Sequence, residues 1–431
     1  MVQGQTFFHL WVSCCWWWWW FVVLLPSSCS IRNVLAFNVS PPPPSLWSRP
    51  ALSVQTQTPM VVAASFSSST FPTAKRLLWN GPCFARLPKS GRKYLMERGG
   101  WEFVDYCKAA EDNNNDLLEF VWPNKEKPKK KTHGGLHQRP SPLALIRPYP
   151  TFVTNVLDDK LLLSTSLAGT GLMPKLVHNP HNDLVDNNNN NNKNQLFFVK
   201  HRHGAQGKSV YVYTYRQLLE WWSRTTSSNS RSNFIIQHEV PPALDPDGRK
   251  FVLRCHVLLH QETNHNHNSS TESCPCRWVH RDVICLPHGA RYDPTSTTTE
   301  RAIHISNQGG KRNRPKPVLV QHLPPNHPAY NCLPKVQAVC ASMMDTIQLP
   351  PIHKVNDDDH TTRTYFALLG VDCLVSNNNH EIQICEVNSH PALGWGTMAN
   401  VANEVFARLV TDTLAIVVFG DKAESTGYQW V

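Results

Sequence analysis

Two apolar runs near residue 380 each carry a carboxylate, and their spacing suits a metal site. Residues 366–375 contain Asp372, residues 381–388 contain Glu386, and a short polar link joins the two runs. If the runs pair as a hairpin, Asp372 and Glu386 lie side by side, and Asn388 follows one strand repeat later. These hard oxygen ligands would leave several Mg²⁺ positions open for water or phosphate. A surface hairpin with solvated acids fits the same pattern.

A glycine-containing segment follows another apolar run. Lys200 ends the run 196–200 and precedes Gly204-Ala-Gln-Gly207-Lys-Ser, after which Val-Tyr-Val-Tyr is typical of a strand. A P-loop would need four residues between the glycines and a helix afterwards, so this segment is not one. A loop between two strands would instead lay backbone N–H groups over phosphates, with Lys200 neutralising them from below. A simple hairpin turn is the alternative.

Two further apolar strands carry polar residues that suit a nucleotide. Gln237 ends a strand at which backbone groups could read the edge of an adenine-sized base. Lys250, Val252 and Arg254 alternate along the next strand and therefore share one face. Lys250 and Arg254 suit anionic oxygens, which arginine binds in bidentate fashion. Two cations on a solvated strand face would give the same pattern.

Composition bounds the possible functions. The 431 residues suffice for two or three packed units. The formal charge of +10 is concentrated in the first 96 residues, which contain eight Lys or Arg and no Asp or Glu. No basic stripe interleaved with aromatic residues is visible, so we do not expect nucleic-acid binding. The basic run 125–131 is interpreted as a solvated loop or as a contact to an acidic partner.

Residues 1–75 are expected to be a targeting leader or a membrane anchor, otherwise disordered. Residues 7–25 are apolar almost throughout and are about long enough to span a bilayer. The acid-free, Ser- and Pro-rich stretch that follows has the composition of a transit peptide, and 34–37 resembles the cleavage region of leaders to complex plastids. A cleaved leader, a retained anchor and a misassigned start codon remain open. We therefore expect the protein in a plastid or the secretory pathway, or else in the cytoplasm or on the cytoskeleton. A membrane is an expected partner only if residues 7–25 are retained.

The pattern of cysteines and of low-complexity runs adds two expectations. Of 13 cysteines, Cys255, Cys373 and Cys385 fall within expected strands, where a small buried thiol is the default, so we expect a mostly reduced protein. Asn-rich runs and a His/Asn stretch cannot build a core and are expected in surface loops, at 113–115, 187–192, 377–379 and 260–268. The histidines of the last stretch are interpreted as solvated rather than metal-binding.

The remaining periodicity predicts strands in the centre of the chain with helices beside them, an α+β fold. Helices are expected within 93–98, from Lys160 and over 398–418, and strands over 196–200, 234–237, 251–259, 303–306 and the two runs of the 366–386 pair.

Taken in order, these motifs resemble the tubulin–tyrosine ligase-like family of ATP-grasp ligases over about residues 91–418. The most specific are Arg-Lys250-Phe-x-x-Arg254, His304-Ile-Ser-Asn307 and Glu386-Val-Asn-x-x-Pro-x-Leu. The resemblance implies an ATP-grasp fold, with the nucleotide sandwiched between two β-sheet subdomains and a small N-terminal α/β domain. The expected division is an N-terminal domain over 76–180, a central subdomain with the glycine flap over 181–260, and a C-terminal subdomain with the metal site over 261–420.

The resemblance also implies roles for individual residues. Contacts to ATP would come from Lys200, Gly204, Gly207, Gln237 and Lys250. The catalytic groups at the γ-phosphate and the acylphosphate would be Arg254, Arg281 and Asn307. The ligands of Mg²⁺ would be Asp372, Glu386 and Asn388. Lys160 loosely matches a substrate-side lysine.

The implied activity is ATP-dependent ligation of a free amino acid to a protein carboxylate through an acylphosphate, of the polyglutamylase or glycylase type. The acceptor would be tubulin or another protein with an acidic tail. The sequence departs from the family at Val252, where members usually carry an acid. Two alternatives stay open: a catalytically inactive relative that binds tubulin or another acidic protein, and a ligase that acts on a small peptide.

Overall fold

The chain divides into two units at residues 63 and 64, and only the second, 64–431, contains residues that the computed structural model describes. The structure describes residues 77–79, 88–99, 102–104, 117–120, 144–184, 195–204, 207, 209–225, 231–263, 275–306, 315–349, 352, 362–391, 393 and 405–431. All of them belong to the second unit. The predicted leader, the basic run 125–131, the Asn runs at 113–115 and 187–192, and Asn307 lie outside the described residues. Within the described part, no helix is both long and apolar enough to cross a bilayer.

The strands form a large sheet and a small one. The large sheet contains β1 (Leu77–Trp79), β2 (Glu102–Val104), β3 (Leu117–Phe120), β4 (Ala144–Pro148), β8 (Arg249–Thr263), β9 (Cys276–His280), β10 (Ile284–Arg291), β11 (Val318–Leu319), β12 (Thr362–Val375), β13 (Ile382–Asn388) and β14 (Tyr428–Trp430). Its main path runs β11-β10-β8-β12-β4-β3-β1-β2, with β13 on β12 and β9 bridging β8 and β14. The small sheet has the order β6-β5-β7 and is formed by β5 (Leu196–His201), β6 (Val210–Thr214) and β7 (Phe234–His238).

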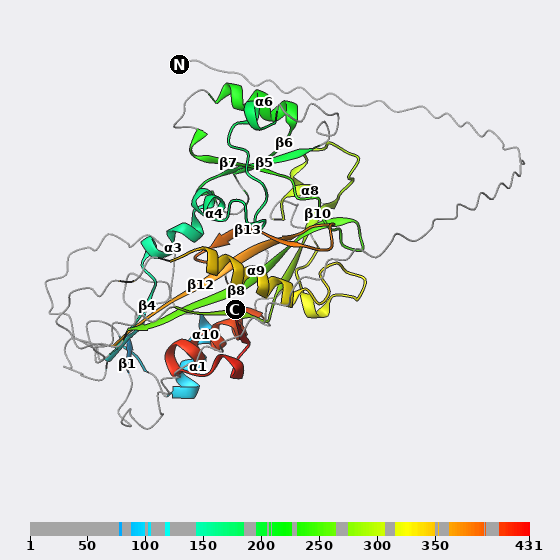
Figure 1. The fold of residues 1–431 in the computed structure, drawn as a ribbon. Helices are drawn as coiled ribbons and strands as arrows, with labels where there is room; N and C mark the ends of the chain where they lie inside the picture. Colours follow the sequence, from blue (N-terminus) through cyan, green and yellow to red (C-terminus); the bar gives the residue numbers. More distant parts are fainter. Residues whose placement is uncertain are drawn as a thin grey trace, which may run out of the picture. The chain divides into compact units, whose positions relative to one another are not determined.

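The helices pack on the two sheets and cover both faces of the large one. They are α1 (Lys89–Gly99), α3 (Thr151–Asp158), α4 (Lys160–Ser166), α5 (Pro180–Asp183), α6 (Tyr215–Arg224), α8 (Arg301–His304), α9 (Leu333–Thr346) and α10 (Ala407–Phe419), with short 3₁₀ turns at η3 (Val320–His322) and η6 (Ala423–Ser425). Figure 1 shows α9 on one side of the β8–β12 pair and α1 and α10 on the other. The apolar clusters agree, since α9 residues belong to one and α1 and α10 residues to the other.

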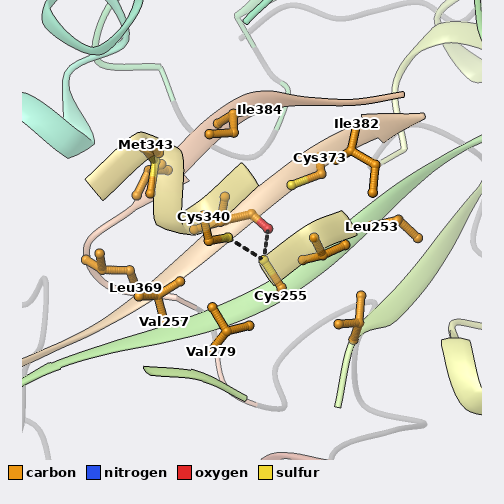
Figure 2. Packing of buried hydrophobic residues seen from close by; sticks show 14 of the residues in the cluster. Leu253, Cys255, Val257, Val279, Cys340, Met343, Leu369, Cys373, Ile382 and Ile384 are labelled. Carbon is orange, nitrogen blue, oxygen red and sulfur yellow. Dashed lines mark hydrogen bonds between the residues drawn. The ribbon is translucent and has the colours of Figure 1, made fainter. Parts of the chain in front are cut away.

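The long antiparallel pair β8–β12 is the centre of the large sheet, because its alternating side chains enter both apolar clusters. Leu253, Cys255 and Val257 face the cluster of α9, whereas Val252 and Leu258 face that of α1 and α10. In the first cluster the Cys255 thiol lies 3.7 Å from the sulfur of Cys340 on α9 and contacts a β12 carbonyl (Figure 2). Cys255, the residue after Arg254, is therefore anchored in the α9 cluster, which fixes this part of β8.

The small sheet has an apolar cluster of its own. Phe197, Val199 and Ile236 pack with Leu218 of α6, all nearly inaccessible. A capping box at the start of α6, made by Thr214 and Gln217, satisfies two free backbone donors. The loop between β5 and β6 is thus carried by a sheet with its own hydrophobic support.

Most of the predicted elements are confirmed and two are wrong. The helices near residue 93 and at Lys160, the strands that carry Lys200, Gln237 and Lys250, and the 366–386 hairpin are all present. Residues 303–306, predicted as a strand, instead fall in and after α8, because the β8–β10 pairing leaves this segment to pack on the sheet face. The final helix ends at Phe419, one residue beyond the predicted end; residues 398–404, in its predicted first half, lie outside the described residues.

The second error concerns His260, which was expected in a solvated insert. It lies in β8, is nearly inaccessible, and its ring centre is 5.9 Å from that of Trp278. Burial lowers the pKa of His260 to about 4, so the ring is neutral near pH 7. The long β8–β12 ladder extends through this position and overrides the local composition. The thiols Cys255 and Cys373 are buried as expected, and neither forms a disulfide.

Candidate nucleotide and metal site

A cavity lies between the two sheets, and most of the predicted site residues line it. The small sheet contributes residues of β5 and β7, and the large sheet contributes residues of β8, β12 and β13. Of the predicted residues, those that line the cavity are Lys200, Gly207, Gln237, Lys250, Asp372 and Glu386. They come from five strands and one loop, so the topology rather than a local motif assembles them.

The carboxylate hairpin has the predicted register. β12 and β13 are antiparallel and Asp372 pairs directly with Glu386. On its other side, β12 places Asp372 opposite Arg254 of β8. The guanidinium of Arg254 donates from Nε to one oxygen of Asp372 and from Nη2 to the other, the second bond being 2.6 Å long. Both side chains are nearly fully buried, so this is a bidentate ion pair out of contact with bulk water.

The second carboxylate is surrounded by cations. Glu386 Oε2 lies 3.4 Å from the ammonium of Lys160, and Oε1 accepts from the amide of Asn388 at 3.5 Å. Burial opposes ionisation of Glu386, but Lys160, Lys200 and Arg254 outweigh it and lower the pKa of this carboxyl. By contrast burial, reinforced by the Glu386 carboxylate, raises the pKa of Asp372 to about 6 although Arg254 opposes the shift. The two adjacent acids therefore have clearly different proton affinities.

These residues fit a magnesium ion. Two buried carboxylates pair directly, and the amide of Asn388 lies beside the second. Each carboxylate accepts about four hydrogen bonds or ligand bonds, so the bidentate contact to Arg254 leaves lone pairs on Asp372 free for a metal. A divalent cation would also relieve the repulsion that raises the Asp372 pKa.

Lys200 and the glycine loop lie at the entrance from the small sheet. β5 and β6 pair as an antiparallel hairpin, with Lys200 opposite Val210 at its end. The Lys200 ammonium is buried and lies 3.3 Å from the Cys385 thiol of β13. Two helices hold the ends of the loop. Lys160 of α4 donates to the Gly204 carbonyl at 2.7 Å, and Arg301 of α8 donates to the Gly207 carbonyl at 2.6 Å. Strand, glycine loop and strand thus occur as predicted.

Lys250 has an unpredicted set of partners. Its ammonium donates to Glu239 Oε1, lies 2.9 Å from Nδ1 of His304, and stands 3.8 Å from the ring centre of Tyr292. His304 Nε2 lies 2.8 Å from the Thr298 carbonyl and must therefore donate, which leaves Nδ1 to accept from Lys250. Burial and the charge of Lys250 lower the pKa of His304 to about 4, so its ring stays neutral. Burial also lowers the pKa of Lys250, against the pull of Glu239.

Gln237 offers an unsatisfied acceptor. Its side chain lines the cavity at 1 % exposure, and its Nε2 is 3.5 Å from the Ser164 hydroxyl. Its Oε1 is buried and has no hydrogen-bond partner. A buried acceptor without a donor is costly, so its presence in a cavity indicates that a bound molecule supplies the donor. The exocyclic amine of adenine is such a donor.

Not every predicted residue reaches the cavity. Arg281 is exposed in the turn between β9 and β10, where its backbone N–H donates to Gly427, and it does not line the cavity. Val252 does line it, pairs with Leu286 of β10, and belongs to the apolar cluster of α1 and α10. Asn307 lies outside the described residues.

Comparison with known proteins gives the family. The model of the tubulin-tyrosine ligase family matches residues 172–426, a span that contains both sheets' contributions to the cavity. The chain belongs to the tubulin-tyrosine ligase family. The domain of this family is ATP-grasp-like, its members are in general ATP-dependent ligases that modify proteins, and they generally use ATP and Mg²⁺. A comparison with curated proteins finds no match to this chain.

Sequence reasoning missed two members of this tubulin-tyrosine ligase-like site. Glu239 and Tyr292 both contact Lys250, yet Glu239 follows the end of β7 and Tyr292 that of β10. Neither belongs to an apolar periodic run with a second polar neighbour, and nothing in the sequence distinguishes Tyr292 from a solvated loop residue. The order Gln237-His-Glu239 was the one available signal, because it places an acid just beyond the strand that carries Gln237.

Proposed function

We propose that this protein is an ATP-dependent ligase that joins a free amino acid to a protein carboxylate through an acylphosphate, in the manner of a tubulin polyglutamylase. The observation that carries the proposal is the convergence of Lys200 and Lys250 with the carboxylate pair Asp372–Glu386 at one cavity, where Arg254 binds Asp372 from behind the lining. Phosphoryl transfer asks a protein mainly for positioning and for neutralisation of charge, and this arrangement supplies both.

The first step activates the acceptor. A carboxylate oxygen of the acceptor attacks the γ-phosphorus of ATP, the bond to the β-γ bridging oxygen breaks, and ADP and an acylphosphate result. Lys200 and Lys250 are placed to bind phosphate oxygens. Arg254 holds Asp372 in a fixed orientation through two hydrogen bonds. Mg²⁺, when bound by Asp372, Glu386 and Asn388, would neutralise charge on the phosphates.

The second step forms the amide. The amine of the incoming amino acid attacks the acyl carbon, the tetrahedral oxyanion collapses, phosphate leaves with the bonding electrons, and the amine loses a proton. Cations near the oxyanion lower the barrier. Lys160, which bridges the glycine loop and Glu386, is positioned between the two halves of the site and is the candidate for this task.

The test is transfer of label. The full chain is incubated with ATP, Mg²⁺, purified tubulin and each radiolabelled amino acid in turn. Transfer that is lost in Glu386→Gln and retained in Glu381→Gln, an exposed glutamate in the turn before β13, supports the proposal and identifies the amino acid. If the protein binds ATP but transfers no amino acid to tubulin, tubulin is not the acceptor.

The inactive relative is a second candidate because of Val252. The position where the family usually carries an acid is here apolar, lies opposite Leu286, and is built into the packing of α1 and α10. A chain that binds tubulin without ATP turnover, and whose melting temperature ATP and Mg²⁺ do not change, would favour this reading.

A further inference from the structure

The cavity holds one carboxylate that the proposed mechanism does not use. Of the described residues that line it, three are acidic, namely Glu239, Asp372 and Glu386. The last two form the metal pair. Glu239 lies just after β7, two residues beyond Gln237, and its side chain is 11 % exposed. A nearly buried acid beside a ligand cavity requires partners, and those partners indicate its task.

Glu239 is held in place before any ligand arrives. One oxygen accepts from Lys250, and the other is 3.4 Å from the Tyr292 hydroxyl, which can donate to it. The backbone N–H of Glu239 donates to the Leu196 carbonyl at 2.9 Å, which fixes the residue to the start of β5. The carboxylate is thus the internal counter-ion of Lys250 and substitutes for the phosphate that this lysine would bind.

Glu239 lies two residues beyond Gln237 and its carboxylate contacts Lys250, so it stands between the groups expected to meet the base and the phosphates of a nucleotide. The unsatisfied oxygen of Gln237 marks the base end, and Lys250 and Lys200 mark the phosphate end. The sugar of a nucleotide connects these ends, and its 2′ and 3′ hydroxyls are hydrogen-bond donors. Val252, which lines the same wall, is apolar and cannot accept. An ionised carboxylate accepts only, with about four lone pairs, and so matches two vicinal hydroxyls.

We infer that Glu239 binds the ribose hydroxyls of the nucleotide and exchanges Lys250 for them when the phosphates enter. This inference rests on the proposed function, because it requires a nucleotide in the cavity. Phosphate oxygens take over Lys250, the carboxylate is released, and the sugar replaces the ammonium as its partner. Glu239 therefore pairs with Lys250 when no nucleotide is bound, and it distinguishes ribonucleotides from deoxyribonucleotides when one is bound.

The experiment compares dissociation constants of ATP, 2′-deoxy-ATP and 3′-deoxy-ATP, each with Mg²⁺, for the full chain and for Glu239→Gln. Loss of a hydrogen bond to a charged group weakens binding by about tenfold to a hundredfold, so the unaltered protein should discriminate against at least one deoxynucleotide to that extent. In Glu239→Gln the ratio should fall to within about threefold. The control is Glu220→Gln, an exposed residue of α6 that pairs with Arg216 and should keep the ratio.

The ratio separates a binding role from a purely structural one. If Glu239 serves only as the counter-ion of Lys250, the variant changes stability and the affinity for all three nucleotides, and the ratio stays as it was, which overturns the inference. Equal binding of the three nucleotides by the unaltered protein overturns it without any variant. Failure of the unaltered protein to bind ATP overturns the proposed function as well, so the two failures are distinguishable.

Discussion

The ion pair between Arg254 and Asp372 offers a quantitative test of the site. The two residues are 9 % and 7 % exposed and share two hydrogen bonds, so removing either partner leaves a buried charge unpaired. Breaking such a pair costs about 3–5 kcal/mol, whereas replacing both partners with apolar residues is often nearly neutral. We therefore expect strong coupling in a double-mutant cycle.

The surroundings make the two halves of the cycle unequal. Arg254→Met leaves Asp372 beside the Glu386 carboxylate, which adds repulsion, and should lower the free energy of unfolding by about 3–5 kcal/mol. Asp372→Leu leaves Arg254 with Glu386 as a remaining counter-charge and should cost less. The double variant Arg254→Met/Asp372→Leu should lose less unfolding free energy than the two single losses added together, by at least about 2 kcal/mol.

The assay is urea unfolding at pH 7.5, with Mg·ATP binding measured on each folded variant. The exposed pair Arg277–Asp345, with N and O atoms 2.7 Å apart, is the control, because a surface pair contributes about 0–1 kcal/mol. All Asp372 and Arg254 variants should lose Mg·ATP binding, including a stable double variant. Effects that add within about 0.5 kcal/mol would refute the reasoning that these charges are desolvated and mutually dependent.

Three further predictions follow from single contacts. Because the pKa of Asp372 is about 6, its ionised fraction should fall about tenfold from pH 7 to pH 5, and the Mn²⁺ affinity measured by titration should fall with it. The stability that protonated Asp372 contributes is complete below about pH 4 and is lost as the pH rises through 6. A Mn²⁺ affinity that does not change with pH would contradict this prediction. Gly427→Ala would place a methyl carbon 2.5 Å from His280 Nε2 and 2.6 Å from an Asp412 oxygen, so it should lower the unfolding free energy by about 1–3 kcal/mol in urea. Thr214→Ala should cost about 1 kcal/mol in the same assay, since it removes the capping box of α6, and an unchanged midpoint would show that the cap contributes nothing.

The hairpin that carries Asp372 and Glu386 is the part of the fold that the sequence predicted best. Alternation along a strand fixes which residues share a face, and a short polar link between two apolar runs fixes their antiparallel pairing. Asp372 opposite Glu386 follows from these local rules, and the structure confirms it. The same rules predicted the strands that end at Lys200 and Gln237 and the shared face of Lys250 and Arg254.

Local composition failed where long-range pairing decided the outcome. His260 begins a His/Asn stretch, yet the β8–β12 ladder carries it into the core. Residues 303–306 are apolar enough for a strand, but α8 forms there and its His304 meets Lys250. In both places the neighbours that stabilise the residue are distant in sequence, so no window of the sequence contains them.

The sequence by itself determined the family, the order of the motifs and the chemistry of each side chain that could bind nucleotide or metal. Only the tertiary structure decided which of these groups meet. It joins Arg254 to Asp372 across 118 residues, sets Glu239 against Lys250, and leaves Arg281 exposed in a turn. The physical reason is that a strand's periodicity fixes the face of a residue, whereas its partners depend on which strands pair and which sheets pack together.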